Sequence, residues 1–114
     1  MLKLITPATV KGDVRITVPG QVDPERIRVE YVYQRASEHD RWRDEVNRKL
    51  AAGTPVPELL HPVIKGWDGV LDQDGKPIEL TFAALQELTD LFPAAAGELY
   101  RGFTAVLTES RAGN

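Results

Sequence analysis

The chain has 114 residues, which favours one domain of ordinary size with a hydrophobic core of its own. It contains no cysteine, so a disulfide framework and a thiolate metal site are excluded. The formal net charge of −3 argues against a general nucleic-acid-binding protein, because such a protein needs excess positive charge to neutralise phosphates. No signal peptide is visible, and no apolar run approaches the roughly 20 residues that span a bilayer, so we expect a soluble intracellular protein.

Residues 1–35 are predicted to be rich in β-strand. Residues 14–18 alternate apolar and polar side chains, which is typical of a half-buried strand. Residues 27–33 begin with the same alternation and then carry strand-forming residues at every position. Turn residues separate the two segments, so we expect an antiparallel pair. A third strand could come from the apolar residues Leu2, Leu4 and Ile5.

A helix is predicted over residues 37–52, on the outside of the domain. Ser37 is the candidate N-cap. One narrow apolar stripe follows at a spacing of four residues: Trp42, Val46 and Leu50. The other positions are largely charged, with Arg41, Arg43, Arg48 and Lys49 interleaved with Glu38, Asp40, Asp44 and Glu45. We interpret this alternation as a solvated, ion-paired face, and a nucleic-acid-binding patch is the alternative.

Helices also dominate the rest of the chain. A short helix through Leu59 and Leu60 is expected near residues 57–63, distorted by Pro62. Thr81 is the predicted N-cap of a helix over residues 81–92, and a last helix follows over residues 94–109. Residues 110–114 are expected to form a short tail. Strands followed by helices predict an α+β fold over residues 1–114, with the helical part spanning residues 36–110.

The stretch between the two halves contains the most distinctive pattern. Trp67 stands between Gly66 and Gly69, which predicts a sharp bend that holds the indole. We favour Trp67 as a core residue reached from a loop, and an exposed partner contact is the alternative. Asp74-Gly75 is predicted to form a two-residue hairpin turn.

The sequence offers little that resembles a catalytic or metal site. His39 and His61 are the only histidines, and neither has an identifiable catalytic partner, so we interpret both as surface or structural residues. The acidic residues from Asp68 to Glu79 do not fit the spacing of a calcium loop. No nucleophile elbow or phosphate-binding glycine loop is present. We therefore expect no enzymatic activity, no cofactor and no metal.

The last predicted helix carries an apolar stripe whose role stays open. Leu99, Phe103, Val106 and Leu107 recur at helical spacing. Such a stripe forms internal core in most domains. Near a chain end it can also form a face for self-association or for a partner protein.

Three segments, together with the order of predicted elements, resemble the tail assembly chaperones of long-tailed phages and prophages. The segments are residues 33–38, 63–70 and 72–81. The most specific part is Gly66-Trp67-x-Gly69-Val70, followed by Asp74-Gly75-x-Pro77 and a helix that starts with Thr81-Phe82. The similarity runs from about residue 4 to residue 107.

The resemblance implies a non-enzymatic protein of the host bacterial cytoplasm. Chaperones of this family are thought to cover the long, apolar, helical tape-measure protein until the major tail tube protein assembles around it. The resemblance also implies that this chain corresponds to the shorter of the two products that many such genes encode. Leu99, Phe103, Val106 and Leu107 are the expected partner-binding residues.

Two other classes of function are consistent with the same sequence. A structural tail component, such as a completion or connector protein, would remain in the virion. A small regulatory or nucleic-acid-binding phage protein would use Arg41, Arg43, Arg48 and Lys49.

Overall fold

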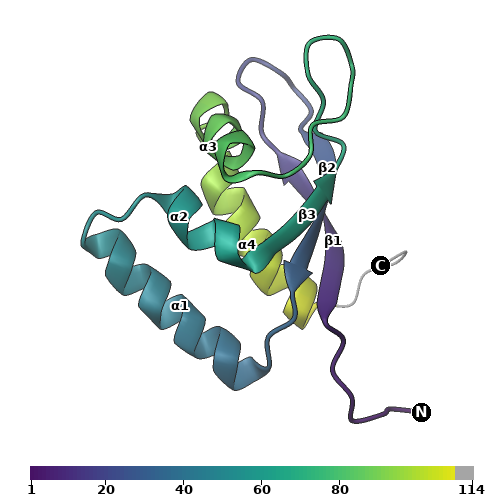
Figure 1. Cartoon of the computed structure of the whole chain (residues 1–114), viewed down its shortest axis with the longest axis vertical. Helices are drawn as coiled ribbons and strands as arrows, with labels where there is room; N and C mark the ends of the chain where they lie inside the picture. The colour runs from purple at the N-terminus through teal and green to yellow at the C-terminus, as the bar shows by residue number, and fades with distance from the viewer. Residues whose placement is uncertain (110–114) are drawn as a thin grey trace.

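A three-stranded antiparallel sheet and the helices that cover it form the domain (Figure 1). The computed structural model describes residues 1–109, and the expected tail at residues 110–114 lies outside them. The strands are β1 (Thr9–Ile16), β2 (Glu25–Val32) and β3 (Ile64–Asp68), in the order β1-β2-β3. The predicted α+β class is confirmed.

The first two strands pair as expected, but the third strand is not the predicted one. β1 pairs with β2 from Thr9–Val32 to Ile16–Glu25, so β1 begins five residues before the alternating segment. Residues 1–7 form no strand. β3 supplies the third strand instead and pairs with β2 through residues 64–68. The assignment of Leu2, Leu4 and Ile5 to a strand was therefore wrong.

The helices lie close to their predicted bounds. They are α1 (Ala36–Ala51), α2 (Val56–Leu60), α3 (Phe82–Leu91) and α4 (Ala95–Thr108), and a 3₁₀ turn at His61–Val63 follows α2. Pro62 lies in that turn, where it ends the α-helical geometry as expected. The Thr81 hydroxyl accepts a hydrogen bond from the Ala84 N–H at 3.0 Å, which confirms it as the N-cap of α3.

The predicted cap of α1 is wrong by two residues. The helix begins at Ala36, so its N-cap residue is Arg35 and not Ser37. The Glu38 carboxylate accepts a hydrogen bond from the Arg35 N–H at 3.0 Å, and Ser37 lies in the first turn. The backbone at this helix start is therefore hydrogen-bonded by a carboxylate of the first turn, and not by the Ser37 hydroxyl.

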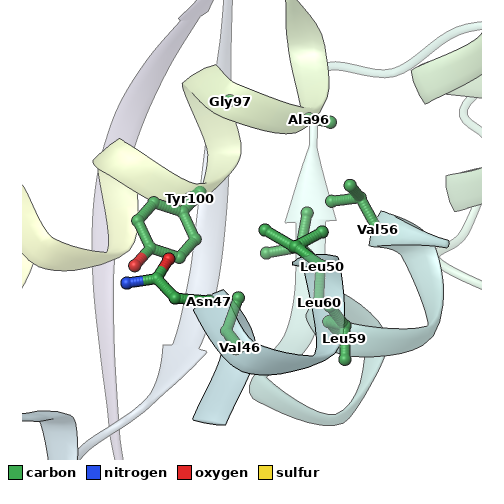
Figure 2. A pocket seen from close by; sticks show the side chains of 9 residues that line it. All are labelled: Val46, Asn47, Leu50, Val56, Leu59, Leu60, Ala96, Gly97 and Tyr100. Atoms are coloured by element: carbon green, nitrogen blue, oxygen red, sulfur yellow. The ribbon is translucent and has the colours of Figure 1, made fainter. Parts of the chain in front are cut away.

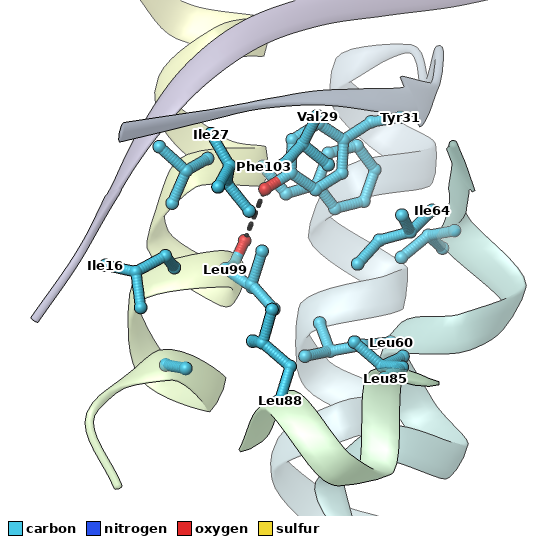
Figure 3. Close-up of a cluster of buried hydrophobic side chains, with 13 residues drawn as sticks. Ile16, Ile27, Val29, Tyr31, Leu60, Ile64, Leu85, Leu88, Leu99 and Phe103 are labelled. Carbon is cyan, nitrogen blue, oxygen red and sulfur yellow. Dashed lines mark hydrogen bonds between the residues drawn. The ribbon is translucent and has the colours of Figure 1, made fainter. Parts of the chain in front are cut away.

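The core lies between the sheet and α4 (Figure 3). The inward side chains of β1 and β2 meet α4, whose Leu99 and Phe103 are fully buried. The Tyr31 ring stacks on Phe103 with centroids 4.9 Å apart, and its hydroxyl donates to the Leu99 carbonyl at 2.8 Å. Further buried side chains come from every other helix and strand: Val14, Ile16, Ile27, Val29, Val46, Leu59, Leu60, Ile64, Leu85 and Leu88.

A glycine lets α4 approach the sheet closely. A Cβ atom on Gly102 would lie 2.9 Å from Val14 Cγ2 and 3.0 Å from the Tyr31 hydroxyl. The side chain of Glu98, one turn earlier, accepts hydrogen bonds from the Thr17 N–H at 3.0 Å and the Thr17 hydroxyl at 2.6 Å. The helix is thus held against β1 both by close packing and by a polar contact at its start.

Trp67 lies in β3 and not in a glycine-flanked bend, so that prediction was wrong. Its backbone pairs with Val29 of β2, and its half-buried ring packs against the core. The indole N–H donates to the Ile78 carbonyl at 2.7 Å. Only Gly69 of the two glycines has positive φ, at 97°. Trp67 is therefore a core-side residue, as favoured, but it is reached from a strand.

The expected turn at Asp74-Gly75 is present, with a longer loop than predicted. The Gly75 N–H donates to the Asp72 carbonyl at 3.0 Å, and Gly75 has φ of 79°. The Asp72 carboxylate accepts from the Asp74 and Lys76 N–H groups at 2.8 and 3.0 Å. Three residues, 73–75, therefore connect the two arms of this hairpin, in the manner of a turn with a following left-handed residue.

Candidate functional site

The stripe on α4 that was expected to meet a partner faces the inside of the domain. Leu99 and Phe103 have no exposed surface. Val106 and Leu107 are half-buried and pack against the same core. Leu99 and Phe103 therefore cannot contact a partner in this fold, which corrects their placement on a binding face, and the core alternative holds for them.

The apolar surface that remains open lies on the other side of α4, where α1 approaches it. The first half of α1 is held tightly against α4 by rings. His39 stacks on Trp42 and meets Phe103 edge-on, with centroids 5.6 and 4.8 Å away. Trp42 in turn stacks on Tyr100 of α4 at 5.4 Å. These contacts fix one end of α1 on the domain.

His39 is a structural residue with both ring nitrogens hydrogen-bonded. Its Nδ1 lies 2.9 Å from Gln34 Oε1, and its Nε2 lies 2.9 Å from Thr104 Oγ1. Only 4% of its surface is exposed, so the expected surface alternative for this residue is wrong. Burial lowers the pKa of His39 below its ordinary value of 6.5, the Arg43 guanidinium lowers the pKa further, and Asp40 acts in the opposite direction.

The second half of α1 stands off from α4 and leaves an apolar groove (Figure 2). We call it the α1–α2–α4 groove. It encloses about 190 Å³. Side chains of α1 and α2 face α4 across this space. The lining residues are Val46, Asn47, Leu50, Val56, Leu59, Leu60, Ala96, Gly97 and Tyr100.

The chemistry of the groove suits an apolar side chain. Its polar groups are the Asn47 amide and the Tyr100 hydroxyl, and the other lining side chains are aliphatic or small. Apolar cavities of about 150 Å³ stay dry and accept a benzene-sized group, so this groove can accept one Leu, Ile or Phe side chain. Leu50, at its mouth, is 38% exposed and accessible from solvent.

The outer face of α1 is charged, as expected. Its basic and acidic side chains are all exposed, including Arg41, Arg43 and Arg48. Lys49 and Glu45 form an ion pair of 2.9 Å one helical turn apart. The α1 helix thus has a solvated, charged face on one side and lines the apolar groove with its other side.

The α2 side of the groove is acidic. No lysine or arginine occurs from residue 50 to 64, and Glu58 of α2 is exposed. Glu87 and Asp90 of α3 line a separate hollow beside Pro57. On the α4 side, the guanidinium of Arg101 lies beside Gly97. The groove therefore has acidic charge near α2 and basic charge near α4.

Among residues 1–109, no group of three or more His, Cys, Asp or Glu side chains is placed to hold a metal ion. No helix in the same range is both long and apolar enough to cross a bilayer. The Asp72 carboxylate accepts hydrogen bonds from backbone N–H groups of its own turn. His61 contacts Phe82 edge-on at 5.5 Å.

The sequence identified apolar residues that line the groove, but it did not predict that they lie together. Val46 and Leu50 were recognised as part of a stripe on the first helix, and Leu59 and Leu60 as part of a short one. Their convergence on Ala96 and Tyr100 depends on contacts between distant segments. Leu50 was the one signal of the groove in the sequence. It continues the apolar stripe of the first helix two turns beyond Trp42, the residue of the stripe that the Tyr100 ring covers.

Comparisons of the chain with models of protein families, with curated proteins and with solved structures found no match.

Proposed function

We propose that this protein is a non-enzymatic tail assembly chaperone of a long-tailed phage or prophage, and that its α1–α2–α4 groove binds the tape-measure protein. The observation that carries the proposal is the groove itself, which is apolar, open to solvent at Leu50 and large enough for one side chain. The resemblance of residues 63–81 to chaperones of this kind supports it. A protein that keeps an apolar client soluble needs an apolar surface bordered by charge.

The mode of binding follows from the shape of the groove. An amphipathic client helix places its apolar side chains into a groove on its partner, one side chain to each pocket. One apolar side chain of the tape-measure protein would fill the space between Leu50, Val56 and Tyr100. The charged outer face of α1 would then remain in water and keep the complex soluble. The major tail tube protein would replace the chaperone as the tail assembles in the host cytoplasm.

The test is co-expression with the tape-measure protein encoded in the same phage or prophage genome. The Leu50→Gln variant places an amide at the mouth of the groove. Because Leu50 is partly exposed, we expect the variant to keep its fold by circular dichroism. The matched control is Leu91→Gln, which changes an exposed leucine of α3 outside the groove lining.

We expect wild-type protein and Leu91→Gln to keep the tape-measure protein in the soluble fraction and Leu50→Gln to lose most of that effect. Equal solubilisation by Leu50→Gln would contradict the role of the groove. Stoichiometric amounts of this chain in purified virions, measured by mass spectrometry, would contradict the chaperone role and favour a structural tail component.

A further inference from the structure

The first residues of the chain form an exposed apolar arm. Residues 1–7 lie outside every helix and strand, and in Figure 1 they extend away from α2. Leu2 and Leu4 are 91% and 98% exposed, and Ile5 is 76% exposed. Isolated exposed leucines are common, but large exposed apolar side chains crowded into five residues that belong to no helix or strand indicate a contact site.

The arm and the α1–α2–α4 groove have matching shapes. In an extended segment, alternate side chains project to one side, so Leu2 and Leu4 share a side and Lys3 faces the other. One leucine side chain is of the size that the groove of about 190 Å³ accepts. The neighbouring leucine would then reach the partly exposed Leu50 at the mouth.

The charges also match. Lys3 is the only charged residue among residues 1–10, so the arm is cationic. On the α2 side of the groove, Glu58 is exposed between the lining residues Val56 and Leu59 of the same helix. An arm that enters from this side keeps Lys3 near the Glu58 carboxylate and away from Arg101 on the α4 side. Electrostatic complementarity of this kind favours one direction of entry.

We propose that residues 1–5 of one copy insert into the α1–α2–α4 groove of a second copy, and that this contact joins copies head to tail. The two surfaces are different parts of the molecule, so an open row of copies joined head to tail keeps a free arm at one end and a free groove at the other. The inference goes beyond the proposed function, because it concerns this chain alone and needs no client protein.

The association is expected to be weak. One short arm in one groove buries much less than the roughly 1,200 Å² of a standard stable interface. Ordering a free segment opposes binding as well, so we expect a dissociation constant on the order of 100 μM. Oligomers should therefore form at high protein concentration and dissociate on dilution.

The test is sedimentation velocity of the purified full chain between about 10 μM and about 1 mM. The arm variant is the double change Leu2→Ser and Leu4→Ser, and the groove variant is Leu50→Gln. Val56→Gln is a second groove variant in case Leu50→Gln loses its fold. Leu91→Gln is the control, because it changes an exposed leucine that belongs to neither surface.

We expect the mean mass of wild-type protein and Leu91→Gln to rise with concentration, while the arm and groove variants stay monomeric. The decisive sample is an equimolar mixture of arm variant and groove variant. The first keeps an intact groove and the second an intact arm, so the mixture should form a one-to-one dimer and nothing larger.

Three results would overturn the proposal. Wild-type protein that stays monomeric throughout would show that the arm binds no second copy. An arm variant that associates like wild type would place the contact elsewhere. A mixture that stays monomeric would exclude head-to-tail insertion. These experiments contain no tape-measure protein, so none of the three results bears on the chaperone proposal. That proposal is tested separately by co-expression with the tape-measure protein.

Discussion

The Tyr31 hydroxyl donates a hydrogen bond to the Leu99 carbonyl across 2.8 Å, and the pair joins the central strand of the sheet to the last helix of the described chain. Tyr31 has no exposed surface. A polar group at this depth must be satisfied, because leaving it unpaired costs free energy comparable to a lost hydrogen bond. The bond therefore fixes which way α4 faces.

Replacing Tyr31 by Phe should destabilise the protein by about 1 kcal/mol. The change keeps the ring stacked on Phe103 and removes only the hydroxyl. Urea unfolding followed by circular dichroism measures the change in free energy of unfolding. Tyr33→Phe is the control, because Tyr33 lies at the partly exposed end of the sheet and should change stability by less than about 0.5 kcal/mol.

Two glycines of α4 should respond in opposite ways to alanine. In Gly102→Ala the new methyl group would lie 2.9 Å from Val14 Cγ2, so we expect overpacking to destabilise the protein by about 1–3 kcal/mol. In Gly97→Ala the nearest atom is the end of the flexible Arg101 side chain, which can move. The higher helix propensity of alanine should then stabilise the protein by up to about 1 kcal/mol.

Thermal and urea unfolding of both variants measure this difference. Equal effects of the two changes would mean that α4 does not approach β1 as closely as Gly102 and Val14 indicate. A Cβ atom on Gly102 would meet side chains of the sheet, whereas one on Gly97 would meet only the side chain of Arg101 in the same helix.

Removing the cap of α3 should also be measurable. Thr81→Ala deletes the acceptor for the Ala84 N–H and should cost about 1 kcal/mol in the free energy of unfolding. Ser37→Ala is the matched control, since Ser37 lies inside the first turn of α1 and Glu38 binds the free N–H there. A loss from Ser37→Ala as large as that from Thr81→Ala would contradict these assignments.

His39 should make stability depend on pH near neutrality. Burial lowers its pKa in the folded state, so the unfolded chain binds a proton more readily. The neutral imidazole therefore stabilises the fold fully above its unfolded pKa of about 6.5, and this stabilisation decreases as the pH falls toward the lower folded pKa. The slope from this one group is at most about 1.4 kcal/mol per pH unit.

The measurement compares urea unfolding of wild-type protein and His39→Gln at pH values from about 5.5 to 7.5. Glutamine keeps a donor and an acceptor for Gln34 and Thr104 but does not titrate. We expect the difference in free energy of unfolding between the two proteins to shrink as the pH falls. A difference that is constant across this range would show that the folded-state pKa of His39 is not lowered.

Features of the fold that depend on neighbouring residues were predictable. Thr81 caps a helix because a hydroxyl at that position meets a backbone N–H three residues later, and Pro62 ends α2 because of its own ring. The alternation in β1 and β2 likewise reports which side of the strand is buried. In each case the partner lies within a few residues.

Features of the fold that depend on distant residues could not be predicted from the sequence. Trp67 looked like a loop residue between two glycines because its strand partner, Val29, is far away in the sequence. His39 stands among charged residues, and its burial depends on Thr104 and Phe103, which lie more than 60 residues later. The groove was missed for the same reason, since it exists only where three helices converge.

The contact between the Thr17 end of β1 and Glu98 of α4, 81 residues apart, has a consequence for synthesis on the ribosome. The two-stranded hairpin can form early, but its apolar face gains the cover of α4 only after residues 95–108 leave the exit tunnel. Until then the nascent chain carries Val14, Ile16 and Val29 without that cover. Slow elongation between the hairpin and α4 would prolong this period and favour capture by ribosome-associated folding factors or premature aggregation.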